Sequence, residues 1–306
     1  MNHLRIIFMG TPEFAVPSLQ ILLKNNIDVV AVVTAPDKPQ GRGQKISYSP
    51  VKECALQYNI PVLQPTNLKA PEFLETLKSY QATLQIVVAF RMLPEVVWSM
   101  PPLGTFNLHA SLLPQYRGAA PINWAIINGE KETGISTFFL KHEIDTGSII
   151  YQEREPIHED DTVGTLYERL MNKGSQLVLK TVRGIEAGNY PSIPQPADVE
   201  IKHAPKIFKE TCQINWNTPS EAVRNFVRGL NPHPTAWTII REKNFKIFRV
   251  SVADKKNTED TPGTIDTDNK QYLYIKTSNG WVSVDELQPE GKKRMAIQEF
   301  FRGNKV

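Results

Sequence analysis

An asparagine and a histidine two positions apart are the residues best placed to do chemistry. They open the string Asn107-Leu-His109-Ala-Ser-Leu-Leu-Pro-Gln-Tyr-Arg-Gly118, which begins in a segment typical of a buried strand. Side chains two apart in a strand point to the same side of the sheet. An amide N–H beside an imidazole can stabilise an oxyanion and move a proton. The pair therefore predicts a group-transfer site.

A carboxylate that could assist the histidine follows in Ile144-Asp145-Thr-Gly147. Taken alone, Asp145 before a glycine is as typical of a turn as of an active site. A lone Asn-x-His is likewise more often a turn cap beside a buried core histidine. The length of the string around Asn107 and His109 favours the catalytic interpretation. No activated serine or cysteine nucleophile accompanies it.

Alternating strands and helices are expected to carry these residues. The expected strands are Leu4–Met9, Asp28–Thr34, Pro61–Leu63, Leu84–Ala89 and Gly104–His109, and the expected helices are Phe14–Lys24, Pro50–Tyr58, Pro71–Ser79 and Pro94–Met100. Strands that are apolar on both faces and separated by helices predict a Rossmann-like, doubly wound, mostly parallel α/β sheet. Ligands of such sheets bind at the carboxyl ends of the strands, where Asn107 and His109 lie.

A proline-rich segment over residues 189–196 is expected to divide the chain in two. The segments expected before it are the strands Ile135–Leu140 and Ser148–Gln152 and a long helix, Val163–Ala187. After it we expect one helix, Glu221–Leu230, and short strands that suggest a smaller OB-like β-barrel. The predicted organisation is a catalytic domain over 1–188, a linker over 189–208 and a C-terminal domain over 209–306.

Composition narrows the class of protein. The 306 residues are 41% hydrophobic and 22% charged, as expected for a globular protein with two domains. No signal peptide and no apolar run of about 18 residues is apparent, so we expect a cytoplasmic protein with no membrane contact. The two cysteines, Cys54 and Cys212, lack metal-ligand spacing, and we expect no metal and two inert thiols.

Basic residues are concentrated in the C-terminal third. Residues 201–306 contain 18 Lys and Arg against 12 Asp and Glu, whereas residues 1–200 contain 17 against 20. A solvated basic face is the commoner explanation of such a bias. The alternative is a polyanionic partner, such as a nucleic acid, that binds the C-terminal domain.

Several blocks together resemble the family of folate-dependent formyltransferases. Besides the string at 107–118, these blocks are Met9-Gly-Thr-Pro-Glu-Phe14, Ala35-Pro-Asp-Lys-Pro-Gln-Gly-Arg42-Gly, Gly118-Ala-Ala-Pro-Ile122, Ile144-Asp145-Thr-Gly147 and Pro289-Glu-Gly-Lys-Lys293. They extend over nearly the whole chain. The resemblance implies acyl transfer from 10-formyltetrahydrofolate to an amine, without a covalent enzyme intermediate.

The resemblance also implies roles for individual residues. Asn107 and His109 would hydrogen-bond the formyl oxygen as it becomes an oxyanion, and Asp145 would pair with the imidazole and help to relay a proton. The residues implied for the folate pocket are Ser111, Leu112, Leu113, Pro114, Phe90 and Met92. One departure is Ala89-Phe90-Arg91-Met92, where many family members have Ala-Tyr-Gly; the aromatic residue is retained.

Within the family, the chain is similar to the members that formylate methionine on initiator tRNA. Lys38, Arg42 and Lys45, in the loop from Asp37 to Lys45, and Lys206 would then contact the tRNA. Without the resemblance, a mobile polar loop with ordinary charges is the commoner fate of a segment like 37–45. The alternative acceptors are a UDP-amino sugar and glycinamide ribonucleotide. A nicotinamide-dependent oxidoreductase is disfavoured because Gly41-x-Gly43 lacks the third glycine of the dinucleotide fingerprint. An RNA-binding protein without activity would leave Asn107, His109 and Asp145 unexplained, and we expect a monomeric enzyme.

Overall fold

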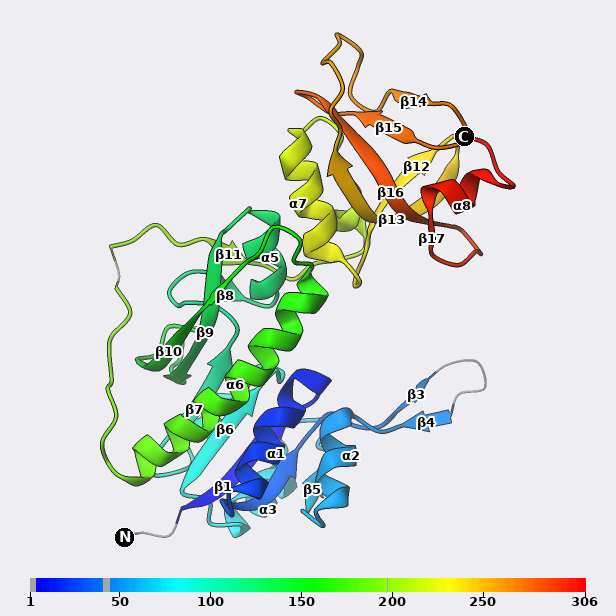
Figure 1. Cartoon of the computed structure of the whole chain (residues 1–306). Coiled ribbons are helices and arrows are strands. Elements are labelled where there is room, and N and C mark those ends of the chain that lie inside the picture. Colours follow the sequence, from blue (N-terminus) through cyan, green and yellow to red (C-terminus); the bar gives the residue numbers. More distant parts are fainter. Residues whose placement is uncertain (1–3, 41–44, 197) are drawn as a thin grey trace. The chain divides into compact units, whose positions relative to one another are not determined.

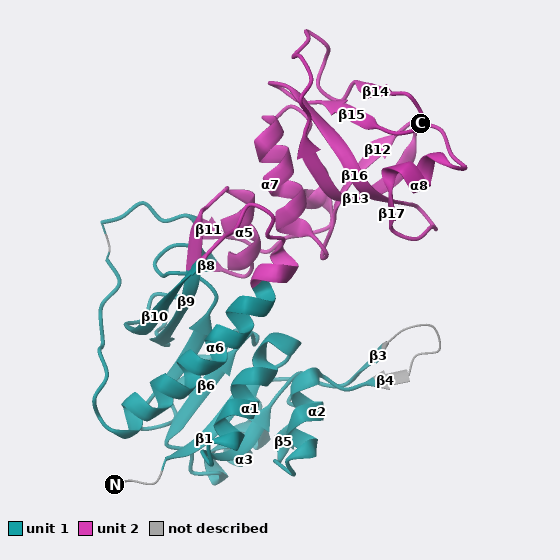
Figure 2. Cartoon of the chain, viewed as in Figure 1, with its two compact units in different colours: residues 1–117, 134–155, 167–202 teal, residues 118–133, 156–166, 203–306 magenta. Residues whose placement is uncertain are grey.

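The computed structural model describes residues 4–40, 45–196 and 198–306, which form two compact units (Figure 2). Unit 1 consists of residues 1–117, 134–155 and 167–202, and unit 2 of residues 118–133, 156–166 and 203–306. Two internal segments thus belong to the same unit as the C-terminal residues. The linear division into 1–188, 189–208 and 209–306 stays a prediction.

Unit 1 is built on a mostly parallel sheet, as the alternation of apolar and amphipathic segments predicts. Its strand order is β10-β9-β7-β6-β1-β2-β5. The strands are β1 (Arg5–Gly10), β2 (Asp28–Val33), β5 (Val62–Leu63), β6 (Leu84–Val88), β7 (Thr105–His109), β9 (Glu132–Phe139) and β10 (Ile149–Pro156). Neighbouring strands from β7 to β5 run parallel, and β9 pairs antiparallel with β7. The expected Rossmann-like fold class is confirmed.

Helices cover both faces of this sheet. They are α1 (Val16–Lys24), α2 (Pro50–Gln57), α3 (Pro71–Ser79), α4 (Glu95–Trp98) and α6 (Val163–Glu186), with a short 3₁₀ helix, η1 (Glu13–Ala15), before α1. Helices α3 and α4 pack on the face that carries Ile7, Met9 and Val87. Helix α6 lies along the sheet (Figure 1), and its Thr181 hydroxyl is 2.8 Å from that of Thr137 on β9. Within the described residues, no helix is long and apolar enough to cross a membrane.

Unit 2 contains an antiparallel sheet, which confirms the expected smaller β-domain. Its strand order is β12-β13-β16-β15-β14, and β17 pairs with β16. The elements are α5 (Pro121–Ile127), α7 (Ser220–Leu230), β12 (Ala236–Ile240), β13 (Lys243–Val252), β14 (Ile265–Thr267), β15 (Leu273–Lys276), β16 (Trp281–Pro289), β17 (Met295–Ala296) and α8 (Ile297–Phe301). The aromatic side chains of Phe245 and Trp281 are buried. They therefore build the core and do not offer surfaces for base stacking.

The expected loop from Asp37 to Lys45 contains a short hairpin instead. Strands β3 (Lys38–Gln40) and β4 (Lys45–Ser47) pair antiparallel. The base of the hairpin is fixed by side chains from outside it. The Lys52 ammonium lies 2.5 Å from the Asp37 carboxylate and donates to the Gln64 amide oxygen at 2.8 Å, and Gln64 donates to Asp37 at 2.8 Å. Composition alone predicted a loop because this anchoring is made by residues distant in sequence.

The hydrogen bond from Lys52, followed by that from Gln64, lowers the pKa of Asp37 below its ordinary value. A lowered folded-state pKa contributes stability above the unfolded-state pKa, and that contribution is lost as the pH falls through the folded-state pKa. We expect Asp37→Asn to be less stable than the wild type at pH 7, with a difference that shrinks below about pH 4. Urea denaturation at several pH values measures this difference. Asp198→Asn, at an exposed aspartate, is the control, and a difference that persists unchanged at pH 3 would contradict the prediction.

Candidate active site

Asn107 and His109 lie at the carboxyl end of β7, inside the sheet of unit 1. In the register of β7, Asn107 pairs with Val87 of β6 and with Phe138 of β9. Leu108 between them faces α6, where a Cβ added to Gly174 would lie 2.8 Å from the Leu108 side chain. Asn107 and His109 therefore share the other face. Among the described residues, no side chain or backbone group hydrogen-bonds the half-buried amide of Asn107, which leaves it available to a ligand.

The imidazole of His109 has a different neighbour at each ring nitrogen. Its Nε2 lies 2.8 Å from the carbonyl oxygen of Tyr116. Because a carbonyl only accepts hydrogen bonds, Nε2 must carry the hydrogen. Its Nδ1 lies 3.8 Å from the Asp145 carboxylate, and both side chains are largely buried, with 7% and 13% of their surfaces exposed. In the neutral imidazole, Nδ1 therefore presents a lone pair on the side of Asp145.

Asp145 lies in a turn between β9 and β10 that is closely packed against the sheet. Its backbone φ of 56° is left-handed, a region that aspartate tolerates better than most residues. Two residues later, a Cβ added to Gly147 would lie 1.5 Å from the Phe139 carbonyl oxygen, so only glycine fits there. The Thr146 hydroxyl donates to the Glu143 carbonyl at 3.0 Å. This local geometry brings the carboxylate to the histidine.

The residues expected to line a folate pocket divide into two kinds. Ser111 and Leu113 are buried and hold the loop in place: the Ser111 hydroxyl donates to the Gln115 carbonyl at 2.6 Å, and Leu113 packs on Phe138. Leu112 and Pro114 are partly exposed. Any contact of this stretch with a ligand is therefore made by Leu112, Pro114 and the backbone.

The residues after β6 show what Arg91 does in this chain. Its guanidinium donates to the Thr66 carbonyl at 3.0 Å and also to that of Pro65. Phe90 packs on the core that includes Leu93 and Val97, whereas 72% of Met92 is exposed. Arg91 thus attaches the loop after β6 to the segment after β5. Of its two neighbours in sequence, Phe90 is packed against the core and Met92 is exposed to solvent.

Gln195 is a contact residue of the site that the sequence did not indicate. Its amide nitrogen donates to the carbonyls of Asp145 at 2.8 Å and Gly147 at 2.9 Å. Its amide oxygen accepts from Arg117 at 2.6 and 3.1 Å. A glutamine between two prolines in an expected linker carries no pattern that predicts such contacts.

The cations expected to contact tRNA lie in two places. Lys38 is exposed on β3, Lys45 begins β4, and Arg42 lies outside the described residues. Lys206, in unit 2, is exposed and has its ammonium 5.3 Å from the centre of the Phe208 ring.

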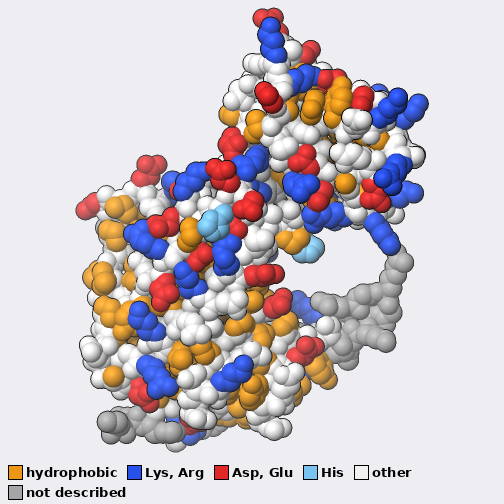
Figure 3. Space-filling view, in the orientation of Figure 1, with side chains coloured by type: hydrophobic (Ala, Val, Ile, Leu, Met, Phe, Trp, Pro, Cys, Tyr) orange, Lys and Arg blue, Asp and Glu red, His pale blue; other side chains and the backbone are white. Residues whose placement is uncertain are grey.

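Basic side chains on unit 2 are partly neutralised. The visible surface carries Lys and Arg side chains with Asp and Glu side chains among them (Figure 3). Arg249 lies 3.7 Å from Asp285, and both Arg294 and Lys255 pair with acids, Glu286 and Asp266 respectively. These pairs use acidic residues that the charge count already includes, so residues 201–306 keep their excess of basic over acidic side chains.

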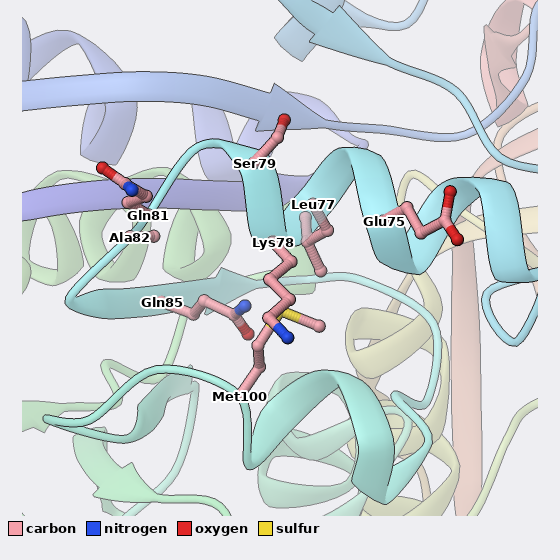
Figure 4. Close-up of a pocket in the computed structure, with 8 residues that line it drawn as sticks. All are labelled: Glu75, Leu77, Lys78, Ser79, Gln81, Ala82, Gln85 and Met100. Carbon is pink, nitrogen blue, oxygen red and sulfur yellow. The ribbon is translucent and has the colours of Figure 1, made fainter.

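No second centre of comparable chemistry emerges from the described ranges 4–40, 45–196 and 198–306. Within them, no group of three or more His, Cys, Asp and Glu residues could hold a metal ion. Burial raises the pKa of the thiols of Cys54 and Cys212, which disfavours either as a nucleophile. A cavity of about 550 Å³ involves Lys78, Gln85 and Met100 (Figure 4). Gln85 stands near the start of β6, at the opposite end of the sheet from His109.

Comparison with known proteins identifies the family. The family described as Formyl transferase matches residues 4–182, and Formyl transferase, C-terminal domain, matches residues 206–305. The chain is 54% identical over 310 residues to the methionyl-tRNA formyltransferase of Bacteroides fragilis, covering 99% of this chain and 95% of that protein. It is 51% identical over 307 residues to that of Flavobacterium johnsoniae, covering 99% and 97%.

Solved structures agree at the level of the fold. An N-formyltransferase from Helicobacter canadensis, in complex with folinic acid and dTDP-3-aminofucose, has a TM-score of 0.67 at 21% identity and covers 94% of this chain and 99% of its own. HypX from Aquifex aeolicus, in complex with tetrahydrofolic acid, has a TM-score of 0.66 at 17% identity; the match covers 99% of this chain and 48% of HypX, so this chain spans about half the length of HypX. The chain therefore belongs to the formyltransferase family, in the group of the methionyl-tRNA formyltransferases.

Proposed function

We propose that the chain transfers a formyl group from 10-formyltetrahydrofolate to the amino group of initiator methionyl-tRNA. The observation that carries this proposal is the identity of 54% to a methionyl-tRNA formyltransferase over nearly the full length of both chains. The sugar-nucleotide alternative has support only from neighbours at about 21% identity, which share the fold. We include in the proposal a monomeric protein that works in the cytoplasm.

In the proposed reaction, the amine attacks the formyl carbon and a new C–N bond forms. The carbonyl oxygen becomes an oxyanion, and the half-buried amide of Asn107 donates a hydrogen bond to it. A preorganised donor stabilises this charge better than water does because it does not have to reorient as the charge develops. The amide has no competing partner among the described residues, in keeping with this role.

The attacking amine must lose a proton, and Nδ1 of His109 is the group that accepts it. Its other nitrogen is committed to the Tyr116 carbonyl at 2.8 Å, which leaves Nδ1 as the free base of the neutral ring. The imidazolium that forms is stabilised by the Asp145 carboxylate, 3.8 Å away. The imidazolium then gives this proton from Nδ1 to the folate nitrogen while the carbonyl re-forms and the bond from the formyl carbon to that nitrogen breaks, so the folate leaves protonated and Nδ1 is again a free base.

The folate donor binds beside this group, at the carboxyl ends of β6 and β7. Phe90 and Met92 form one wall of its pocket, and Leu112 and Pro114, with the backbone of Ser111 and Leu113, form the other. Both walls follow strands whose ends meet at the same edge of the sheet. The basic residues Lys38, Arg42, Lys45 and Lys206 bind the tRNA through its phosphates.

Removing the oxyanion donor or the base should slow the transfer. We expect Asn107→Ala and His109→Ala each to reduce formyl transfer by roughly 10²-fold or more, the magnitude seen when one oxyanion donor or one general base is lost. Transfer of radiolabelled formyl groups to methionyl-tRNA measures the effect. Asn172→Ala, at an exposed asparagine of helix α6 outside the site, is the matched control. Near-normal turnover of either site variant would refute the assigned roles.

Arg42→Ala should impair use of the tRNA while leaving folate binding intact, because the side chain is proposed to touch only the acceptor. The expected result is a higher KM for methionyl-tRNA and an unchanged dissociation constant for the folate, measured by steady-state kinetics and by equilibrium binding. Lys69→Ala removes one positive charge from an exposed position elsewhere in unit 1 and should change neither constant. Equal losses in both constants for Arg42→Ala would point to a disturbed fold instead.

A further inference from the structure

The proline-rich stretch around Gln195 packs against the active-site loops of unit 1. We call residues 193–196 and 198–202 the strap. At one end, the backbone of Ile193 pairs with that of Ile149 through hydrogen bonds of 2.8 and 2.9 Å. At the other end, Gln115 donates to the Glu200 carbonyl at 2.9 Å, and the Tyr116 amide donates to the Lys202 carbonyl at 2.6 Å. The strap is thus attached to the chain on both sides of Gln195.

The side-chain amide of Gln195 has all of its hydrogen-bonding capacity in use. Its two N–H groups donate to the carbonyls of Asp145 and Gly147, and its oxygen accepts twice from the Arg117 guanidinium. A glutamine amide offers two donors on nitrogen and two acceptor positions on oxygen. Carbonyls only accept and a guanidinium only donates, so the neighbours also fix which way the amide points. Among the other side chains, only asparagine offers the same set of groups, on a side chain that is one carbon shorter.

These contacts reach both neighbours of the His109 imidazole. On the Nδ1 side, Gln195 binds the backbone of Asp145, whose carboxylate lies 3.8 Å from the ring. On the Nε2 side, it binds the side chain of Arg117, the residue that follows Tyr116, whose carbonyl accepts from the ring. The two loops that bracket the imidazole are therefore connected through one amide.

We propose that Gln195 is a positioning residue for formyl transfer, which holds the Asp145 turn and the Tyr116–Arg117 loop at fixed places on the two sides of His109. This inference rests on the proposed function, since it assigns Gln195 an effect on that reaction. Gln195 does not touch the reacting atoms; it acts through Asp145. The Asp145–His109 distance of 3.8 Å is longer than a hydrogen bond, so a small shift of the turn changes the field at Nδ1 appreciably.

Two substitutions separate the hydrogen bonds that Gln195 donates to Asp145 and Gly147 from those that it accepts from Arg117. Gln195→Glu is isosteric and still accepts from Arg117, but it replaces the two donors with an oxygen that faces the carbonyls of Asp145 and Gly147. Gln195→Ala removes both sets of hydrogen bonds without adding charge. We expect kcat to fall by about 10- to 100-fold in each variant, the effect of a displacement of around 1 Å at a reacting group. The KM values for folate and tRNA should change by less than about threefold, because no binding contact is lost. The control is Gln213→Glu, the same change at an exposed glutamine of unit 2.

A double-mutant cycle distinguishes positioning from a general loss of structure. If Gln195 acts through Asp145, then Gln195→Glu in an Asp145→Asn background should lower kcat by less than about threefold further. A purely structural defect would multiply with the loss caused by Asp145→Asn and would also lower the melting temperature. A wild-type kcat in both Gln195→Glu and Gln195→Ala, or fully multiplicative losses in the cycle, would overturn the inference.

Amide hydrogen exchange tests the inference without any acceptor substrate. Gln195→Glu should speed exchange in peptides that contain residues 141–148, and Gln213→Glu should not. Unchanged exchange there would overturn the positioning role. If the wild type failed to formylate methionyl-tRNA, the proposed function would fall, and the exchange result would still decide whether Gln195 fixes the Asp145 turn.

Discussion

The arrangement of the site depends on two groups that flank the imidazole of His109, a backbone carbonyl at one ring nitrogen and a carboxylate near the other. The Tyr116 carbonyl fixes the hydrogen on Nε2, and the Asp145 carboxylate lies 3.8 Å from Nδ1. Neither neighbour lies on the strand that carries the histidine. The ring is therefore placed by the rigid sheet, and its chemistry is set by loops. This division explains why buried residues such as Ser111 and Leu113 matter here: they hold one of those loops in place without facing a ligand.

Most elements of unit 1 could be predicted because they follow from short-range patterns. The expected strand Gly104–His109 matches β7 to within one residue, and the expected helix Pro71–Ser79 coincides with α3. Period and capping are local properties, so a single sequence carries them. The hairpin of β3 and β4 was missed because its base is anchored by Lys52 and Gln64, which no local pattern connects to Asp37. The helix α5 was missed for a related reason, since its seven residues are too few to show a clear period.

The same contrast between local patterns and long-range contacts applies to the residues of the candidate site. Asn107 and His109 could be found because both lie on one strand, where a spacing of two places their side chains on the same face of the sheet. The approach of Asp145 to His109 was expected from resemblance to a family, and the structure supplies the distance. Gln195 could not be found, because its partners Asp145 and Arg117 lie 50 and 78 positions away in sequence. The prolines of residues 189–196 predicted a stiff linker. Their number gives no information about which side chains Gln195 contacts.

The basic residues of the C-terminal third pointed to a polyanionic partner without showing which cations would bind it. Residues 201–306 contain 18 Lys and Arg against 12 Asp and Glu, and Lys255, Arg249 and Arg294 pair with acidic neighbours in the same unit. Such pairs leave the excess of positive charge unchanged, but the acidic neighbours compete with a polyanion for these three cations. The residues proposed for the transfer step, by contrast, all belong to unit 1. The proposed chemistry of formyl transfer therefore uses residues of one compact unit, whereas the cations proposed to bind the acceptor come from both units.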